Sequence, residues 1–596
     1  MLKSHIEFKN DNPFINIDGE LHSPLAYTTY FEECGEFHDF IKAGYKMFFI
    51  NVSFANLPIN NITAFSPFNT GVFDGETSDY TEFDGIVNEI LKECPDAFIF
   101  PRINIVMPEK WLKENVYETV ETPCGINRES LFSNKFREDG TKLLKELVSH
   151  IRSSEYANRI AGYQLCGGTT QEWIHPDLFG SFSEMGKEKF KLWLNEKYKR
   201  TDIIDIAKDD FNCGEFNEKA SLYGEFCCEK VAETIEYFAK ELKSFINNEQ
   251  IVGFFYGYNF YVDNYLWGLH GLRFIIGSPY IDFFSSPCGY DDSRSLGIDW
   301  GDMLPVNSLK LHNKLYFVEC DIRTHLTTRM QNSRPGRYPD NIYLLTYEDG
   351  DKTVWSGPET EALSISALYK AFSHHLMKGS GIWWFDMWGG WYHSERIMTE
   401  IEKMKPIFET LKDNKKEYVL NPEVAIFVDE KAYVNNPRGS EYCHSVNRIR
   451  IAMGNTGIPY DLYMVEDAES VIKNYKTAIF PAPLPSESGK KALSLCKEFG
   501  IQCIETNSQK TYYTTDELRE LLVSNGVHCY NKDGNVIYCG NSFLGIHAKN
   551  DGEVKITLPG IFKIKSLQSS KNINIESNEI VLNIKKFETC LFELSV

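Results

Sequence analysis

The feature of this sequence that most constrains its fold is a series of eight short apolar runs within the first 400 residues. None shows the polar–apolar alternation of a strand with one exposed face, so each is typical of a strand covered on both sides. The segments between them are longer, and several have a period near 3.6 residues, as in 186–198 and 220–245. The runs are Pro24–Tyr30, Met47–Ser53, Ala97–Asn104, Ile160–Leu165, Ile251–Tyr256, Ile281–Ser286, Leu315–Glu319 and Gly381–Asp386.

Strands that alternate with helices predict a parallel sheet, and eight such units predict that the sheet closes into a (β/α)₈ TIM barrel. The alternative is an open doubly wound sheet. That fold usually carries a glycine-rich phosphate-binding turn after its first strand, and the segment Tyr27–Glu33 contains none. We therefore expect an α/β protein whose barrel occupies residues 1–415.

Two smaller units are predicted to follow the barrel. The strand–helix pattern restarts after Pro406, and it predicts a flavodoxin-like α/β unit without a GxGxxG motif over residues 416–525. Its expected strands are 421–428, 458–463, 476–481 and 502–505, with helices at 446–453 and 490–499. Short alternating runs at 535–538, 553–558, 561–565 and 579–584 then predict a small antiparallel β-sandwich over residues 526–596.

Composition excludes several classes of function. The net charge is −22, from 84 acidic and 62 basic residues, which argues against binding to nucleic acid phosphates. No run approaches the roughly 20 apolar residues of a membrane span, and the first residues contain no apolar signal core. Fifteen cysteines without CxxC spacing predict a reduced, cytoplasmic protein. No HxH, HExxH or cysteine cluster is present, so we predict no metal and no other cofactor.

Two glutamates stand where strands of the predicted barrel end. Glu172 follows the fourth strand and Glu319 ends the seventh. Catalytic groups of TIM barrels lie at these carboxyl ends, and paired carboxylates about 5–5.5 Å apart cleave glycosidic bonds with retention. We expect Glu172 to be the acid, because the adjoining Trp173 offers an apolar wall that raises its pKa. Glu319, followed by Asp321 and Arg323, is the expected nucleophile.

Aromatic and polar side chains near the predicted barrel mouth are typical of a sugar-binding site. Trp173, Trp384 and Trp388 are expected to contact substrate, although a place in the core is an equal alternative for Trp384. Arg102 and Asn104, at the end of the third strand, are expected to bind hydroxyls, and Arg102 is as compatible with a structural role. Tyr290, after the sixth strand, is expected to donate a hydrogen bond to the nucleophile.

Three segments resemble the clan A retaining glycoside hydrolases, most closely the family 42 β-galactosidase group and the related bacterial β-mannosidases. They are Gly162–Trp173, Val318–Asp321 and Gly381–Asp386. Residues 457–463 and 475–481 are similar to the flavodoxin-like trimerisation domain of that group, and the β-rich end of the chain to its C-terminal domain. The resemblance implies that Glu172 is the acid/base, that Glu319 is the nucleophile, and that the protein is a homotrimer.

The chain departs from this family at one position of the site. The clan usually has asparagine before the acid/base glutamate, where it binds the sugar 2-hydroxyl, and this chain has Gln171. The longer amide can reach the same hydroxyl or reshape the pocket, which leaves the identity of the sugar open.

The sequence therefore predicts an exo-acting retaining β-glycosidase that hydrolyses terminal sugars of small oligosaccharides. A β-galactoside is the first expected substrate and a β-mannoside the second. Two alternatives remain: a non-catalytic carbohydrate-binding barrel, which would not need both glutamates, and a lyase or isomerase, which would need a metal or a lysine base at a strand end.

Overall fold

The computed structural model describes most of the chain. The described residues are 1–57, 66, 68, 70–122, 125, 127–177, 182–202, 206–211, 215–261, 265–328, 330–336, 356–413, 420–436, 444–568 and 571–596.

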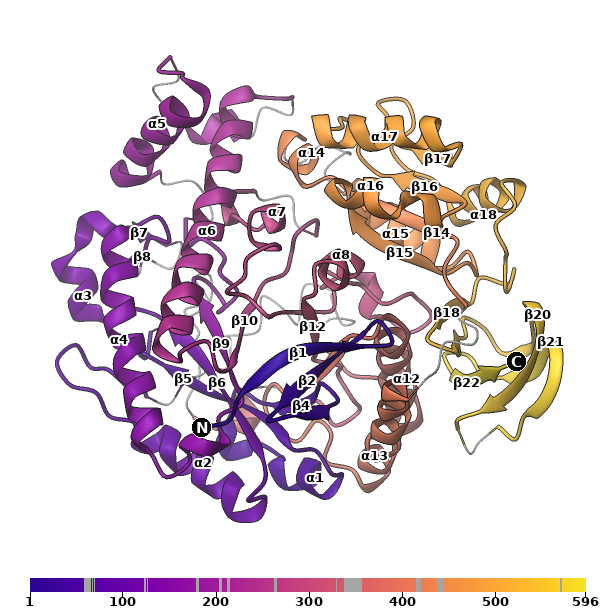
Figure 1. Ribbon diagram of the computed structural model, residues 1–596, viewed down its shortest axis with the longest axis horizontal. Coiled ribbons are helices and arrows are strands. Elements are labelled where there is room, and N and C mark those ends of the chain that lie inside the picture. Colours follow the sequence, from indigo (N-terminus) through magenta and orange to yellow (C-terminus); the bar gives the residue numbers. More distant parts are fainter. Residues whose placement is uncertain are drawn as a thin grey trace.

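The eight apolar runs form one closed barrel of parallel strands, which confirms the predicted fold (Figure 1). Each strand pairs with the next along the chain, and β13 pairs with β4 to close the barrel. Every residue of these strands is buried, because one set of side chains fills the interior and the alternate set packs against the helices. The strands are β4 (Leu25–Thr28), β5 (Met47–Ser53), β6 (Phe98–Ile105), β9 (Gly162–Gly167), β10 (Ile251–Phe255), β11 (Phe283–Pro287), β12 (Leu315–Cys320) and β13 (Gly381–Phe385).

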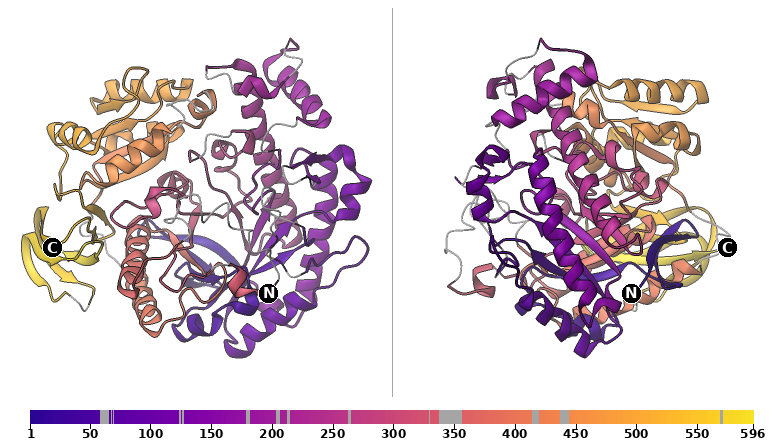
Figure 2. Two further views of the ribbon diagram at one scale, coloured as in Figure 1. Left: turned by 180° about the vertical axis from the view of Figure 1, so that it is seen from behind. Right: turned by 60° about the vertical axis from the view of Figure 1, so that its left-hand side comes forward.

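Helices surround the barrel, and the two predicted from periodicity are present as α5 and α6 (Figures 1 and 2). Each begins at a capping side chain: Ser183 accepts from the backbone of Gly186, and Asn217 from that of Ala220. The helices are α1 (Phe37–Lys42), α2 (Thr81–Glu93), α3 (Glu109–Glu114), α4 (Asn134–Ser153), α5 (Glu184–Tyr198), α6 (Glu218–Phe245), α7 (Leu272–Ile275), α8 (Val306–Leu311), α9 (Met330–Ser333), α12 (Glu361–Lys378) and α13 (Glu395–Glu409). Within the described ranges, no helix is both long and apolar enough to cross a membrane.

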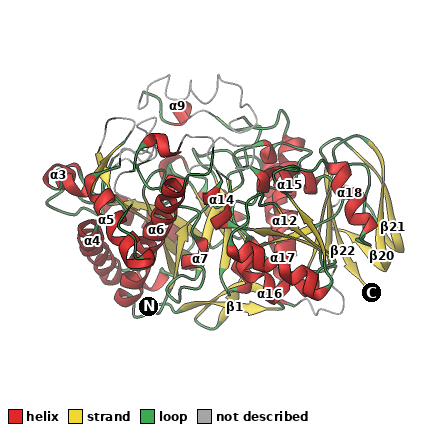
Figure 3. Cartoon of the chain, turned by 90° about the horizontal axis from the view of Figure 1, so that it is seen from above, coloured by secondary structure: helices red, strands yellow, loops and turns green. Residues whose placement is uncertain are grey.

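A three-stranded antiparallel sheet closes the amino end of the barrel. It consists of β1 (Ser4–Lys9), β2 (Asn12–Ile17) and β3 (Glu20–His22). Ile15 and Ile17 of β2 pack into the same apolar cluster as residues at the starts of the barrel strands. Figure 3 shows β1 at the end of the barrel opposite α9, which follows β12. The carboxyl ends of the strands therefore form the other mouth. A short hairpin, β7 (Thr119–Glu121) and β8 (Asn127–Glu129), lies between α3 and α4 along the chain.

The second unit is a four-stranded parallel sheet with the order β15-β14-β16-β17. This 2-1-3-4 order is that of a flavodoxin-like sheet, and the four predicted strands and two predicted helices are present, whereas α14, α16 and α18 were not predicted. The expected boundary at 415/416 lies outside the described residues. The elements are β14 (Val424–Val428), α14 (Glu430–Asn435), α15 (Ser445–Gly454), β15 (Tyr460–Met464), α16 (Ala468–Val471), β16 (Thr477–Phe480), α17 (Glu487–Phe499), β17 (Gln502–Glu505) and α18 (Thr515–Ser524).

The last unit is antiparallel, as predicted, and its strands are hydrogen-bonded into one sheet instead of two separate layers. The two expected strands at 553–558 and 561–565 are one long strand, β20, with an irregular register between Thr557 and Phe562. The sequence pattern missed β19 and β22, which are buried almost throughout and pack on α12, so they do not alternate. The sheet order is β18-β19-β22-β20-β21, with β18 (Val536–Gly540), β19 (Phe543–His547), β20 (Gly552–Ser566), β21 (Asn574–Ile584) and β22 (Thr589–Ser595).

Candidate active site

Two buried glutamates meet at the carboxyl mouth of the barrel. Glu319 lies at the end of β12, the seventh barrel strand, and Glu172 lies five residues beyond β9, the fourth. Their side chains are almost fully buried, with residue exposures of 2% and 7%. The charge of Glu172 contributes to raising the pKa of Glu319, so the two carboxyls are close enough to interact. The fold thus brings together the pair that the sequence singles out.

The loop that carries Glu172 has a strained backbone. Thr170, Gln171 and Trp173 have φ values of 58°, 69° and 57°, in the left-handed region that side chains other than glycine rarely adopt. Such residues cost about 1 kcal/mol or more each and persist where the surrounding structure holds them, often at active sites. Here the Trp173 amide donates to the Gly167 carbonyl (2.7 Å), which folds the loop back onto the end of β9. The result is a fixed position for the Glu172 carboxyl.

The Glu172 carboxyl is surrounded by hydroxyl donors and lacks a direct cationic partner among the described residues. Tyr258 donates to Oε1 (3.1 Å), and the Thr170 hydroxyl donates to Oε2. Burial raises the pKa of Glu172 to about 7, with the two hydrogen bonds opposing this rise. A carboxyl with this pKa holds a proton near neutral pH and releases it readily, as a general acid/base must.

The Glu319 carboxyl faces a buried arginine. Arg102, on β6, places Nη2 3.7 Å from Glu319 Oε2, and its guanidinium lies 4.8 Å from the Trp383 ring and 5.1 Å from that of Tyr30. Burial raises the pKa of Glu319, and the Arg102 charge opposes that effect. The net effect leaves the pKa of Glu319 well above its ordinary value, and Arg102, which is always charged, is the group that most favours its ionised form.

A third carboxylate, Asp321, lies two residues beyond Glu319 and is fully buried. The Nη1 and Nη2 atoms of Arg294 each lie 2.9 Å from one oxygen of Asp321. Arg323 Nη1 lies 2.6 Å from Oδ2. Burial alone would raise the pKa of Asp321, but the two arginines lower it below its ordinary value. The Tyr290 hydroxyl, which the sequence analysis expects to donate to Glu319, donates to Asp321 Oδ2 (3.3 Å).

Two amides at this end of the barrel have polar atoms without hydrogen-bond partners in the described part of the chain. Both the side-chain oxygen and the side-chain nitrogen of Gln171 are buried and have no hydrogen-bond partner among the described residues. Asn104, on β6, donates to Ser53 Oγ (3.0 Å) but leaves its own Oδ1 unpaired. Buried amide groups without partners are costly, and sugar hydroxyls are groups that can satisfy them. Trp388 packs nearby on the rings of Tyr30 and Phe31.

Two of the predicted substrate contacts are corrected by the structure. Trp384 is fully buried on the outside of the barrel, where its Nε1 donates to the Tyr45 hydroxyl (3.0 Å). Alternate residues of a strand point to opposite faces, and because Trp383 fills the barrel interior, Trp384 faces the helices. Trp173 likewise packs on Phe238 of α6 and donates to the Leu165 carbonyl. Neither indole lies at the barrel mouth, so burial by the surrounding chain, not the Trp173 ring alone, raises the pKa of Glu172.

Tyr258 and Tyr30 belong to the site, and the sequence interpretation did not assign them a role. Tyr258 follows β10 by three residues, and Tyr30 follows β4 by two. Both positions are carboxyl ends of barrel strands, so the rule that identifies Glu319 also points to them. The rule alone does not select them, because many side chains follow strand ends and only packing decides which turn inward.

The hydrogen bond from Tyr258 to Glu172 supports a specific prediction. Tyr258→Phe removes a donor that lowers the pKa of Glu172, so we expect the alkaline limb of the pH profile to move to higher pH. A hydrogen bond to a charged group contributes about 1.5–3 kcal/mol, so kcat/KM should fall about tenfold or more. Steady-state kinetics from pH 5 to 9 measure both effects. An unchanged or downward-shifted limb would contradict the assigned contact.

Some side chains of the described residues are grouped as metal ligands would be. Two sets of side chains have suitable spacing: Asp302, His374 and His375, and an exposed set of Glu36, Asp39 and His393. Neither set includes Glu172 or Glu319.

Several solved structures share the fold of this chain. No protein-family model and no curated protein matches the chain. Among solved structures, a cold-adapted β-galactosidase from Rahnella sp. R3 superposes with a TM-score of 0.59 at 11% identity, covering 96% of this chain and 98% of that one. A GH42 exo-carrageenase from Bacteroides ovatus gives 0.60 at 13%, covering 100% and 84%. An α-L-fucosidase from Paenibacillus thiaminolyticus gives 0.52 at 9%, covering 96% and 100%. At these identities the likeness establishes a shared fold across nearly the whole chain.

Proposed function

We propose that this protein is an exo-acting retaining β-glycosidase that removes terminal sugars from small oligosaccharides. The observation that carries the proposal is the pair of buried carboxyls that follow strand four and end strand seven: Glu319 lies beside a fixed arginine and Glu172 beside neutral hydroxyls. A double-displacement mechanism requires one carboxyl of such a pair to be ionised and the other protonated, and the arginine beside Glu319 favours the ionised form there. The shared fold with GH42 β-galactosidases adds support, because that fold hosts glycoside hydrolysis in its solved members.

In the first half of the proposed reaction, Glu319 attacks the anomeric carbon while Glu172 protonates the departing oxygen. We assign the ionised form to Glu319, because Arg102 is the cation beside it, and the proton of the pair to Glu172. In the second half, Glu172, now ionised, takes a proton from the water that breaks the glycosyl-enzyme bond. Tyr258 and Thr170 stabilise the ionised form of Glu172 at that stage, since both donate to it.

The proposed substrate is a β-galactoside, with a β-mannoside second. Gln171, immediately before the acid/base and with its amide buried and unpaired, is the proposed partner of the sugar 2-hydroxyl, and Asn104 and Arg102 are proposed to bind neighbouring hydroxyls. Trp388 is proposed to pack against the sugar from the eighth strand. Assaying the purified protein for turnover of a panel of nitrophenyl sugars tests the proposed substrate.

We expect turnover of nitrophenyl β-galactoside, with retention visible by NMR of the first-formed product. Turnover of the β-mannoside alone would favour the second substrate. Binding of sugars without turnover of any member of the panel would favour the non-catalytic barrel and overturn the enzymatic proposal.

We also propose that the protein is a cytoplasmic homotrimer. The similarity of the second unit to a trimerisation domain supports the assembly, and the twelve described cysteines, which are all unpaired, support a reducing compartment. Sedimentation velocity should give a single species of three chains. A monomer at micromolar concentration would contradict the proposed assembly without affecting the assignment of the glutamates.

A further inference from the structure

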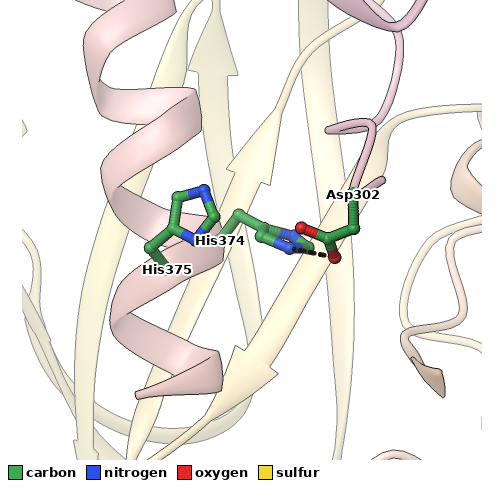
Figure 4. A group of neighbouring side chains, drawn as sticks. All are labelled: Asp302, His374 and His375. Atoms are coloured by element: carbon green, nitrogen blue, oxygen red, sulfur yellow. Dashed lines mark hydrogen bonds and ion pairs between the residues drawn. The ribbon is translucent and has the colours of Figure 1, made fainter. Parts of the chain in front are cut away.

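A buried cluster of metal-ligand-type side chains outside the active site is formed by Asp302, His374 and His375. The two histidines are successive residues of α12, and Asp302 lies in the segment between β11 and α8 (Figure 4). All three are buried, with exposures of 5%, 6% and 0%. One potential ligand atom from each lies within 4.8 Å of the others. Three ligand-type side chains therefore converge in a region from which bulk water is excluded.

The ordinary interpretation of this cluster is a histidine–aspartate pair, and it explains only part of the observations. His374 Nε2 lies 2.8 Å from Asp302 Oδ2, which satisfies those two atoms. Asp302 Oδ1 and both ring nitrogens of His375 remain buried without a hydrogen-bond partner among the described residues. Because an imidazole needs a partner for its N–H when it is buried, a fully buried ring with none requires a further explanation.

We propose that Asp302, His374 and His375 bind a divalent first-row transition metal ion, with zinc as the reference case. Two imidazoles and one carboxylate form a common donor set for such ions, and a tetrahedral zinc bonds N and O ligands at about 2.0–2.2 Å. Ligand atoms at tetrahedral angles then lie about 3.4 Å apart, so the cluster closes onto the ion with side-chain shifts of about an ångström. Asp302 and one ring nitrogen of His375 gain the partner they lack.

The surroundings provide a place for a fourth ligand and shield the ion. A cavity of about 30 Å³ borders Asp302 and His374, which is enough for one water molecule. The ring of Trp300 packs edge-on against His375 at 5.0 Å, and that of Tyr538 packs against His374 at 5.4 Å. The protein supplies three ligands, so the water completes a four-coordinate site.

The location of the cluster indicates a structural role. The cavity beside it is lined by the barrel segment 299–302, by α12, by residues 454–462 of the second unit and by 537–539 of the C-terminal sheet. All three units of the chain meet there. A metal ion bound there would fix α12 to the segment before α8, two barrel elements that border this junction, because binding to the folded form alone stabilises that form.

Zinc content of the full-length protein tests the proposal. The protein is treated with chelator, incubated with a small excess of zinc chloride and passed through a desalting column, and zinc per chain is measured by mass spectrometry. We expect about one zinc per wild-type chain, and a thermal midpoint about 2 °C or more above that of the chelated protein. His375→Phe, which keeps a ring between Trp300 and Tyr316, should lose both the zinc and the zinc-dependent shift.

Two further variants make the outcome decisive. Asp302→Asn keeps a hydrogen-bonding group beside His374 but removes the anionic ligand, so it should also lose zinc. This variant tests the proposal even if His375→Phe fails to fold. His393→Ala disrupts the other, exposed set of possible ligands and should retain the zinc of the wild type. Absence of zinc from the wild type, or equal zinc in wild type and both cluster variants, would overturn the proposal.

Discussion

Glu319→Ala is expected to abolish turnover of aryl β-glycosides, with kcat falling roughly 10⁴-fold or more. The substitution removes the carboxylate that would attack the anomeric carbon and leaves a space where Arg102 now faces no counter-charge. Azide can enter such a space and attack in place of the carboxylate. It should therefore restore part of the activity and give the α-glycosyl azide, because a single displacement inverts the configuration.

The measurement is the initial rate with nitrophenyl β-galactoside, with and without azide, together with NMR assignment of the azide product. Glu225→Gln serves as the matched control: it also removes a buried carboxylate, but from α6, where Lys197 and Lys431 are its partners. We expect that control to retain wild-type kcat. Retention of activity in Glu319→Ala, or rescue with a β-azide product, would show that Glu319 is not the nucleophile.

Glu172→Gln is expected to lower kcat/KM for substrates with poor leaving groups by about 10²–10⁴-fold. The wild-type profile should be bell-shaped, and its alkaline limb should lie near neutral pH, because burial raises the pKa of Glu172 to about 7. The sign follows from the role: the acid acts when protonated, so activity falls as the pH rises through that value. An amide cannot titrate, so the variant should lose the alkaline limb.

Leaving-group dependence separates this effect from a general loss of structure. Dinitrophenyl glycosides need little protonation, so their first reaction step should be much less impaired than that of nitrophenyl glycosides. In Glu172→Ala, azide should act on the glycosyl-enzyme and give the β-azide, the product of two inversions. An alkaline limb that persists in Glu172→Gln would show that another group supplies the proton.

The barrel was predictable because its determinants are local. Each apolar run, from Pro24–Tyr30 to Gly381–Asp386, must be covered on both faces, and eight such runs separated by helices leave few arrangements. The amino-terminal sheet and strands β19 and β22 escaped prediction for the opposite reason. Their pairing and burial depend on partners far along the chain, such as α12 for β19 and β22, and not on their own pattern.

The candidate site was likewise predictable in part. The sequence by itself determined that Glu172 and Glu319 would stand at the ends of strands four and seven, because the count of βα units sets their place around the barrel. Only the tertiary structure decided which neighbours they have. Trp384 turned outward because Trp383 fills the interior, Tyr290 reached Asp321, and Tyr258 reached Glu172. Side-chain direction and contact depend on packing among distant segments, and that information is not present in any single stretch of sequence.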